Sequence, residues 1–234
     1  MPIVLPLDEE IIRRLIKLRR KVDITAIVEG ETDKIFLREL FKLINPKLTV
    51  FCIPATGKKL IVDITRLSGS IQAILSKKRR MVKLLSIDCD DKRPGTAIKS
   101  IYDSLKARGE NIEKISEGYR TLIARSGIHK LIILALGAYR NEKLTSLGVV
   151  RYAMEDYALL SVLEKPEMFG LDKEEIKDIK GETSKGILEM LADKLGRSYE
   201  DFLEDIFTKA VRREILIRFI RDLCTEVKKA LTDP

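Results

Sequence analysis

Short apolar runs alternate with longer amphipathic segments over the first 136 residues of the chain. Four runs are almost entirely apolar, as expected of strands buried on both faces of a parallel sheet, and they lie at residues 24–28, 48–53, 82–87 and 131–136. Helical spacing of apolar residues follows three of them, in segments 32–43, 60–77, 96–108 and 112–125. This alternation predicts an α/β fold with about four parallel strands flanked by helices.

Helical spacing also dominates both ends of the chain. Residues 8–21 have the pattern of an amphipathic helix that packs against the domain following it. After residue 147 no apolar strand run is evident, and helical patterns cover 184–195, 199–207 and 211–231. We therefore expect three parts, namely an N-terminal helix over 1–21, an α/β domain over 22–165 and a helical C-terminal region over 166–234.

The composition is that of a globular protein without a membrane span. Hydrophobic residues make up 45% of the 234 residues and charged residues 34%. The longest apolar run, at 131–136, is far shorter than the ~20 residues that cross a bilayer. The first ten residues lack the basic start and apolar core of a secretory signal. We expect a cytoplasmic protein without a membrane partner.

Charge and rare residues narrow the chemistry. The net charge of +8 favours polyanionic partners such as nucleic acid, although basic charge also serves simply to solvate a surface. Three widely spaced cysteines and one histidine, His129, argue against a zinc site, a Ser/His/Asp triad or a Cys/His pair. Only three Asn and one Gln accompany 44 basic and 36 acidic residues, a balance typical of proteins from very hot habitats.

Acidic residues follow two of the apolar runs. Glu29 and Asp33 come after the run at 24–28, and Asp88 and Asp90 come at the end of the run at 82–87. The carboxyl ends of parallel strands meet at one edge of a sheet, so these side chains are expected to lie close together. Such a concentration of negative charge requires a cation, and carboxylates with waters and phosphates suit Mg2+.

Asp88 and Asp90 are the primary metal ligands in this interpretation. They are two residues apart, so an extended backbone would place both carboxylates on one face. The alternative is a capping cluster for the helix that begins near Thr96.

Glu29, Gly30 and Asp33 form the second half of the expected site. Glu29 is placed to donate or accept a proton or to be a second metal ligand. Gly30 has no Cβ and would let a substrate phosphate approach the backbone. Asp33, at the start of a helix expected to be capped by Thr32, either reaches back to the site or interacts with the helix dipole.

A loop after the second strand is expected at the same edge. Residues Gly57, Lys58 and Lys59 are placed there to contact substrate phosphate. They do not make a P-loop, because Cys52 stands where the first glycine belongs and Lys59 where Ser or Thr would hold the metal.

Residues 29–37, with the sequence EGETDKIFL, and the Asp-Cys-Asp triplet at 88–90 resemble a Toprim domain. This module is shared by bacterial primases, topoisomerases and overcoming-lysogenization-defect nucleases. The resemblance covers about residues 22–165 and implies a compact Rossmann-like sheet that binds one or two Mg2+ or Mn2+ ions for phosphoryl transfer on nucleic acid. Glu29 matches the family glutamate, and Asp88 and Asp90 match its DxD motif.

The spacing of Glu29 and Asp33 is similar to that of the nuclease branch. That branch has a later acidic motif, which Met154-Glu155-Asp156 resembles, so the resemblance implies Glu155 as a further metal ligand. The alternative is a solvated helix glutamate. The branch also has a downstream lysine, for which Lys185 is a candidate, although nothing in the local sequence distinguishes it from other lysines.

These resemblances favour a metal-dependent nuclease that hydrolyses phosphodiester bonds of DNA or RNA, with Glu29, Asp88 and Asp90 as catalytic residues. Longer nucleases of this branch are fused to an ATPase, and no Walker motif is present here, so a separate ATPase or a repair protein is the expected partner. The first alternative is a non-catalytic adaptor with the same fold that binds nucleic acid in DNA repair. The second is a small-molecule phosphotransferase or nucleotidyltransferase.

Overall fold

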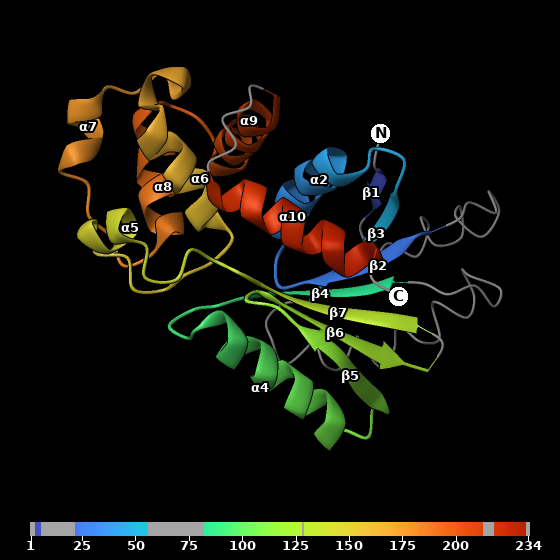
Figure 1. Ribbon diagram of the computed structural model, residues 1–234. Helices are drawn as coiled ribbons and strands as arrows, with labels where there is room; N and C mark the ends of the chain where they lie inside the picture. Colours follow the sequence, from blue (N-terminus) through green and yellow to red (C-terminus); the bar gives the residue numbers. More distant parts are fainter. Residues whose placement is uncertain (1–2, 6–21, 56–81, 128, 213–217, 233–234) are drawn as a thin grey trace.

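The computed structural model describes residues 3–5, 22–55, 82–127, 129–212 and 218–232. Its centre is a seven-stranded sheet with the strand order β1-β3-β2-β4-β7-β6-β5 (Figure 1). The strands are β1 (Ile3–Leu5), β2 (Ile24–Val28), β3 (Thr49–Pro54), β4 (Val82–Asp88), β5 (Ile112–Glu117), β6 (Thr121–Ser126) and β7 (His129–Leu136). The expected α/β architecture, a mostly parallel sheet with helices on both faces, is confirmed.

Parallel pairing places the ends of the central strands side by side. Strand β2 pairs with both β3 and β4, and β4 pairs with β7 up to the contact between Asp88 and Leu136. All five residues of β2 are buried, which explains its continuous apolar sequence. Glu29 and Asp88 therefore emerge from neighbouring strands at the carboxyl edge of the sheet.

The expected helix over 112–125 is wrong, because this segment forms the antiparallel hairpin β5–β6. Strand β6 pairs with β7 through Leu122, Ile123 and Ala124, all of which are buried. Ile112 and Ile115 are three residues apart, a helical spacing, but Ile115 is exposed in β5 and the pairing of β6 along β7 sets the structure of this segment. The sheet therefore has five strands joined by parallel pairing, including the unexpected β1, and β6 and β5 extend it beyond β7 through two antiparallel pairings.

The other expected helices are found where the structure describes their residues, namely α2 (Glu31–Ile44), α4 (Pro94–Ala107), α8 (Ser184–Lys194), α9 (Tyr199–Arg212) and α10 (Arg218–Thr232). The structure adds four helices that were not predicted individually: α5 (Glu142–Ser146), α6 (Glu155–Glu164), the 3-10 helix η1 (Pro166–Phe169) and α7 (Lys173–Lys177). Thr32 is not the cap of α2, because the cap is Gly30. The helices expected over 8–21 and 60–77 lie outside the described residues.

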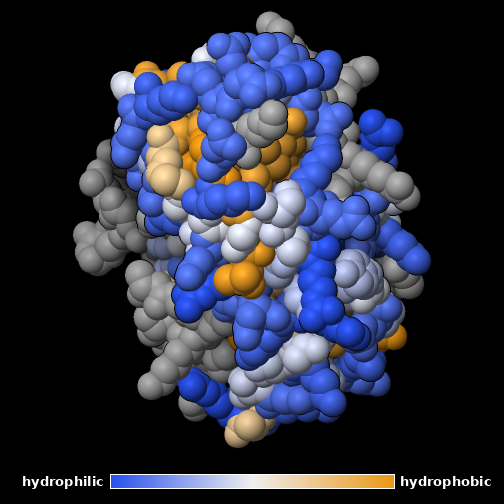
Figure 2. All heavy atoms as spheres, turned by 90° about the vertical axis from the view of Figure 1, so that its left-hand side faces the viewer, coloured by the Kyte–Doolittle hydropathy of each residue, from blue (hydrophilic) through white to orange (hydrophobic). Residues whose placement is uncertain are grey.

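The helices form three groups around the sheet (Figure 1). Helix α4 covers one face, and α2 and α10 cover the other. Helices α5 to α9 gather at one end of the sheet, next to the carboxyl ends of the parallel strands. Figure 2 shows this end from outside, where mainly hydrophilic residues surround a small hollow with hydrophobic residues. None of the described helices is long and apolar enough to cross a membrane.

Aromatic rings join the helical end to the rest of the molecule. Phe36 of α2 stacks on Tyr157 of α6, with ring centroids 5.3 Å apart and an angle of 7° between the planes. Phe36 also contacts Phe207 of α9 at 5.1 Å. We call Phe36, Tyr157 and Phe207 the aromatic stack. It connects α2, α6 and α9 beneath the edge at which the acidic residues lie.

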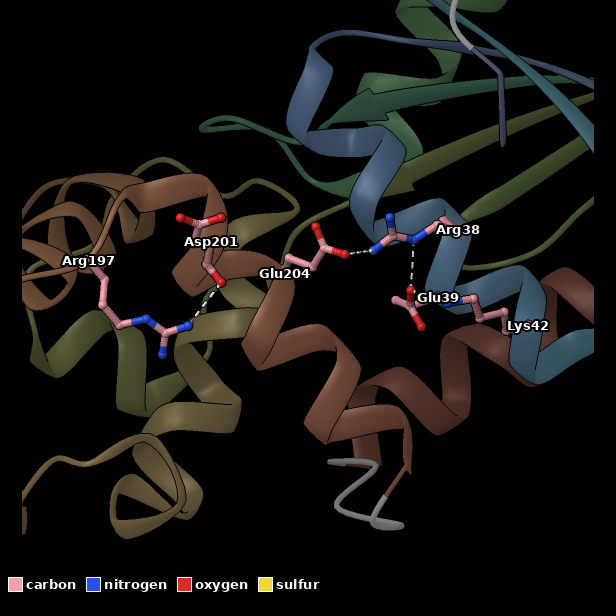
Figure 3. A network of polar contacts seen from close by, with 6 residues as sticks. All are labelled: Arg38, Glu39, Lys42, Arg197, Asp201 and Glu204. Carbon is pink, nitrogen blue, oxygen red and sulfur yellow. Dashed lines mark hydrogen bonds and ion pairs between the residues drawn. The ribbon is translucent and has the colours of Figure 1, made fainter. Parts of the chain in front are cut away.

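An ion pair strengthens the same junction. Arg38 of α2 contacts Glu204 of α9 at 2.7 Å and Glu39 at 2.8 Å, and Figure 3 shows its guanidinium between the two carboxylates. Lys42 contacts the buried Glu39 at 2.5 Å. Helix α9 is therefore held on α2 by apolar and by charged contacts.

Candidate functional site

Four carboxylates from four elements meet at the carboxyl edge of the sheet. Glu29 follows β2, Asp33 lies in the first turn of α2, Asp88 ends β4, and Glu155 begins α6. The charges of Glu29, Asp33 and Glu155 act on Asp88, and those of Glu29 and Glu155 act on Asp33. We call these residues the carboxylate cluster. The sequence predicted their convergence from the strand ends, and the family resemblance supplied Glu155.

Glu29 reaches across from β2 to β4. Its Oε1 atom accepts a hydrogen bond of 2.9 Å from the backbone N–H of Asp88. The two strands are hydrogen-bonded neighbours, so the bond spans a single strand spacing. The Glu29 carboxylate is thereby held beside the Asp88 side chain.

Asp33 both caps α2 and lies within the carboxylate cluster. Its Oδ2 atom accepts a bond of 2.8 Å from the N–H of Gly30, so it helps to cap α2. It is also only 5% exposed and belongs to the cluster. Burial, and then the charges of Glu155 and Glu29, raise the pKa of Asp33 to about 7, although the bond from Gly30 opposes this. A cation would relieve the repulsion.

Asp88 links β4 to α6. Its Oδ1 atom accepts a bond of 3.1 Å from the N–H of Met154, the residue before α6. Burial, followed by the charges of Asp33, Glu29 and Glu155, raises the pKa of Asp88 well above its usual range. Asp88 is therefore the member on which the charges of the other three converge.

Glu155 is 7% exposed and has a partner that the sequence did not indicate. Its Oε1 atom accepts a bond of 3.1 Å from the hydroxyl of Tyr199, the first residue of α9. Burial and the charge of Glu155 raise the pKa of Tyr199 above its usual range, so the phenol stays protonated as a donor. The expected alternative, a solvated helix glutamate, does not describe this buried side chain.

Lys185 does not contact the cluster directly but contacts Tyr199, which is bonded to Glu155. Its side chain is exposed, its Nζ atom is 5.5 Å from the centroid of the Tyr199 ring, and it is 3.8 Å from Glu189. The separation of 5.5 Å between Nζ and the ring centroid suits a cation–π contact. The Tyr199 ring therefore lies between Lys185 and Glu155.

Asp90 has a different setting from the one predicted. It is exposed and has φ of +51°, so the chain turns directly after Asp88 instead of continuing extended. Its backbone pairs with Tyr152 through two bonds of 2.8 Å. The contacts that define the cluster come from the other four carboxylates, and a role of Asp90 as ligand stays a prediction.

The expected substrate-binding glycine and loop have separate outcomes. Gly30 caps α2 with ordinary extended backbone, and a Cβ added there would come no closer than 3.8 Å to other atoms. The chain itself does not require glycine at this position, and approach of a phosphate stays a prediction. Gly57, Lys58 and Lys59 lie outside the described residues.

Asp156 is a second buried carboxyl that the sequence did not single out. Its oxygens accept bonds of 2.7 Å from the N–H of Ala138 and 2.5 Å from the hydroxyl of Ser184. It thus joins the loop after β7 to the start of α8.

Glycine is required before Ala138, because Gly137 has φ of +116° and an added Cβ would lie 2.7 Å from the carbonyl carbon of Tyr152.

The pH dependence of stability should report this buried acid. Burial raises the pKa of Asp156 from 3.8 to about 7, so between these values the folded protein holds a proton that the unfolded chain releases. That contribution to stability is lost as the pH rises toward 7. From pH 5 to pH 8 in EDTA, Asp156→Asn should therefore gain roughly 2–3 kcal/mol of unfolding free energy relative to the unaltered protein.

Urea unfolding at both pH values measures this difference. Asp103→Asn, an exposed change of the same type on α4, serves as the control and should give a constant difference. If the two Asp156 profiles run parallel, the raised pKa is contradicted.

The donor set of the cluster fits a hard divalent cation, since its members are carboxylate oxygens with charges that repel one another. Among the described residues, however, no group of three or more His, Cys, Asp or Glu side chains is already arranged to hold a metal ion. Comparison with family models, curated proteins and solved structures found no match to this chain.

Proposed function

We propose that the protein is a Mg2+- or Mn2+-dependent nuclease that hydrolyses phosphodiester bonds of DNA or RNA. The observation that carries this proposal is the convergence of Glu29, Asp33, Asp88 and Glu155 at the edge where parallel α/β sheets bind ligands. The similarity of residues 29–37 and 88–90 to a Toprim domain of the nuclease branch supports it.

The cluster residues would hold one or two ions, with Asp90 as a further ligand beside them. A bound ion supplies polarisation of a phosphoryl oxygen and acidification of a water. Glu29 is fixed by its bond from the Asp88 N–H and would take the proton of the attacking water or serve as a ligand. Asp88 and Asp33 would give up their protons on binding, because ligands must be deprotonated.

The polyanionic substrate is inferred from charge. The chain carries a net charge of +8, and Lys185 is exposed next to the cluster. Lys185, together with Lys58 and Lys59, would neutralise phosphates. A separate ATPase or repair protein as partner and a cytoplasmic location stay predictions.

Glu29→Gln tests the catalytic assignment without removing the bond that holds the side chain. Glutamine keeps the Oε1 acceptor for the Asp88 N–H but has no charge and cannot take a proton. We expect at least about 100-fold slower cleavage, the range for loss of a general base, with a melting temperature that does not fall.

Cleavage is measured on labelled single- and double-stranded DNA and RNA with Mg2+, Mn2+ or EDTA, at elevated temperature. Glu113→Gln, an exposed change on β5, is the matched control and should cleave normally. Cleavage that persists in EDTA, or that is equal in Glu29→Gln, contradicts the proposal.

A non-catalytic nucleic-acid-binding adaptor is the second candidate. The absence of a preformed ligand group among the described side chains favours it. Such an adaptor would bind nucleic acid equally well with and without EDTA, and Asp88→Asn would leave its affinity unchanged. A nuclease would instead lose cleavage in EDTA, and it would also lose cleavage in the Asp88→Asn variant.

A further inference from the structure

We propose that Tyr199 is a positioning residue that orients the carboxylate of Glu155 within the metal-binding cluster. This inference rests on the proposed function, because it assigns Tyr199 a role only if the cluster binds a divalent cation. It adds a residue from α9, in the C-terminal helical region, to a site otherwise built from β2, β4, α2 and α6.

The contact is specific in its atoms and its setting. The Tyr199 hydroxyl donates to Oε1 of Glu155 at 3.1 Å, and the two residues are 44 positions apart in the chain. The carboxylate is 7% exposed, so water has little access to replace the phenol as donor. The bond occupies one of the two carboxylate oxygens and restricts rotation of the side chain.

The hydroxyl is presented by a helix that is itself held in place. Phe207 of α9 contacts Phe36 of α2 at 5.1 Å, and Glu204 of α9 contacts Arg38 of α2 at 2.7 Å (Figure 3). Phe36 lies one turn after Asp33, so the helix that carries Asp33 also supports the helix that carries Tyr199. The donor is therefore fixed relative to the cluster.

The ring of Tyr199 has a further contact on its face. Nζ of Lys185, at the start of α8, lies 5.5 Å from the ring centroid. The Tyr199 ring is therefore placed between a lysine charge and a glutamate that belongs to the cluster. Removal of the hydroxyl alone leaves this ring contact available and isolates the bond to Glu155.

Tyr199→Phe is the direct test. Partners that orient metal ligands typically change metal affinity by about 10–100-fold, so we expect Mn2+ affinity measured by calorimetry to fall about tenfold. Cleavage should weaken mainly through a higher Mn2+ requirement, while the KM for nucleic acid stays the same. The matched control is Tyr102→Phe in α4, which lies outside the cluster. It removes a hydroxyl that donates to the carbonyl of Ile112 at 3.5 Å.

A second comparison separates positioning from a general structural effect. Because Tyr199 acts through Glu155, Tyr199→Phe should have no further effect on Mn2+ affinity in a Glu155→Ala background, which has no side-chain oxygen left for the hydroxyl to orient. An equal loss in both backgrounds overturns the inference. This comparison remains valid even if the phenylalanine variant is less stable, because both backgrounds share that change.

The outcomes for the two proposals differ. If the unaltered protein binds Mn2+ and Tyr199→Phe binds it equally well, the positioning role is overturned and the proposed function stands. If the unaltered protein binds no Mn2+, the proposed function and the inference are both overturned. A tenfold loss in Tyr199→Phe that disappears with Glu155→Ala supports both.

Discussion

Asp88→Asn is expected to lower metal-dependent cleavage roughly a thousandfold while making the metal-free protein more stable. A divalent ion supplies several kcal/mol of transition-state stabilisation, and each 1.36 kcal/mol corresponds to a factor of ten in rate. Asparagine lacks the charge that an ion needs but keeps an oxygen for the bond from the Met154 N–H. The local structure should therefore survive.

The gain in stability follows from the crowding of charge. Burial and the charges of Asp33, Glu29 and Glu155 disfavour the ionised form of Asp88 in the folded state. A raised pKa of this kind lowers folding stability as the pH rises. Near pH 8 without metal, the neutral amide should therefore raise the unfolding free energy.

Urea unfolding in EDTA and cleavage in Mn2+ test the two effects in the same variant. Asp91→Asn is the control, since Asp91 is exposed in the loop that directly follows. That control should change neither quantity. Retained cleavage in Asp88→Asn would contradict the assignment, and reduced stability would show that the aspartate is structural.

Phe36→Ala should have the largest effect on stability, a loss of about 3–5 kcal/mol. Phe36 is 2% exposed and is the ring between Tyr157 and Phe207 in the aromatic stack. Removal of its ring leaves a cavity where α2, α6 and α9 meet. These helices carry Asp33, Glu155 and Tyr199, so Mn2+ affinity should fall as well.

Phe169→Ala provides the comparison for this prediction. Phe169 is also buried, but its ring contacts Phe202 at 6.5 Å, outside the aromatic stack. Both variants should lose stability in urea unfolding, and only Phe36→Ala should bind Mn2+ more weakly at a temperature where both are folded. Equal Mn2+ affinities in the two variants would contradict the link between stack and cluster.

The parallel part of the sheet was predictable because its strands are buried on both faces. Val28 and Ile87 end almost entirely apolar runs, so the sequence indicated that Glu29 and Asp88 emerge at a shared edge. The hairpin at 112–126 was not predictable in the same way. One of its strands is largely exposed, and its pairing along β7 is a contact distant in sequence.

The residues of the site also differ in whether the sequence predicts their placement. Asp33 follows Glu29 by four residues, a spacing visible in the sequence. The turn at Asp90 depends on pairing with Tyr152, and the bond from Tyr199 to Glu155 depends on the packing of α9. Such contacts arise from tertiary structure, and no local sequence pattern around these residues predicts them.

The order of the elements along the chain has a consequence for synthesis. Glu29, Asp33 and Asp88 leave the ribosome before Glu155, and Tyr199 with the helix that supports it leaves later still. N-terminal segments begin to fold while the remainder is being made. A nascent chain therefore holds three of the four acidic groups without the fourth or its hydrogen-bond donor. Under the proposed function, full nuclease activity is acquired only after α9 has been synthesised.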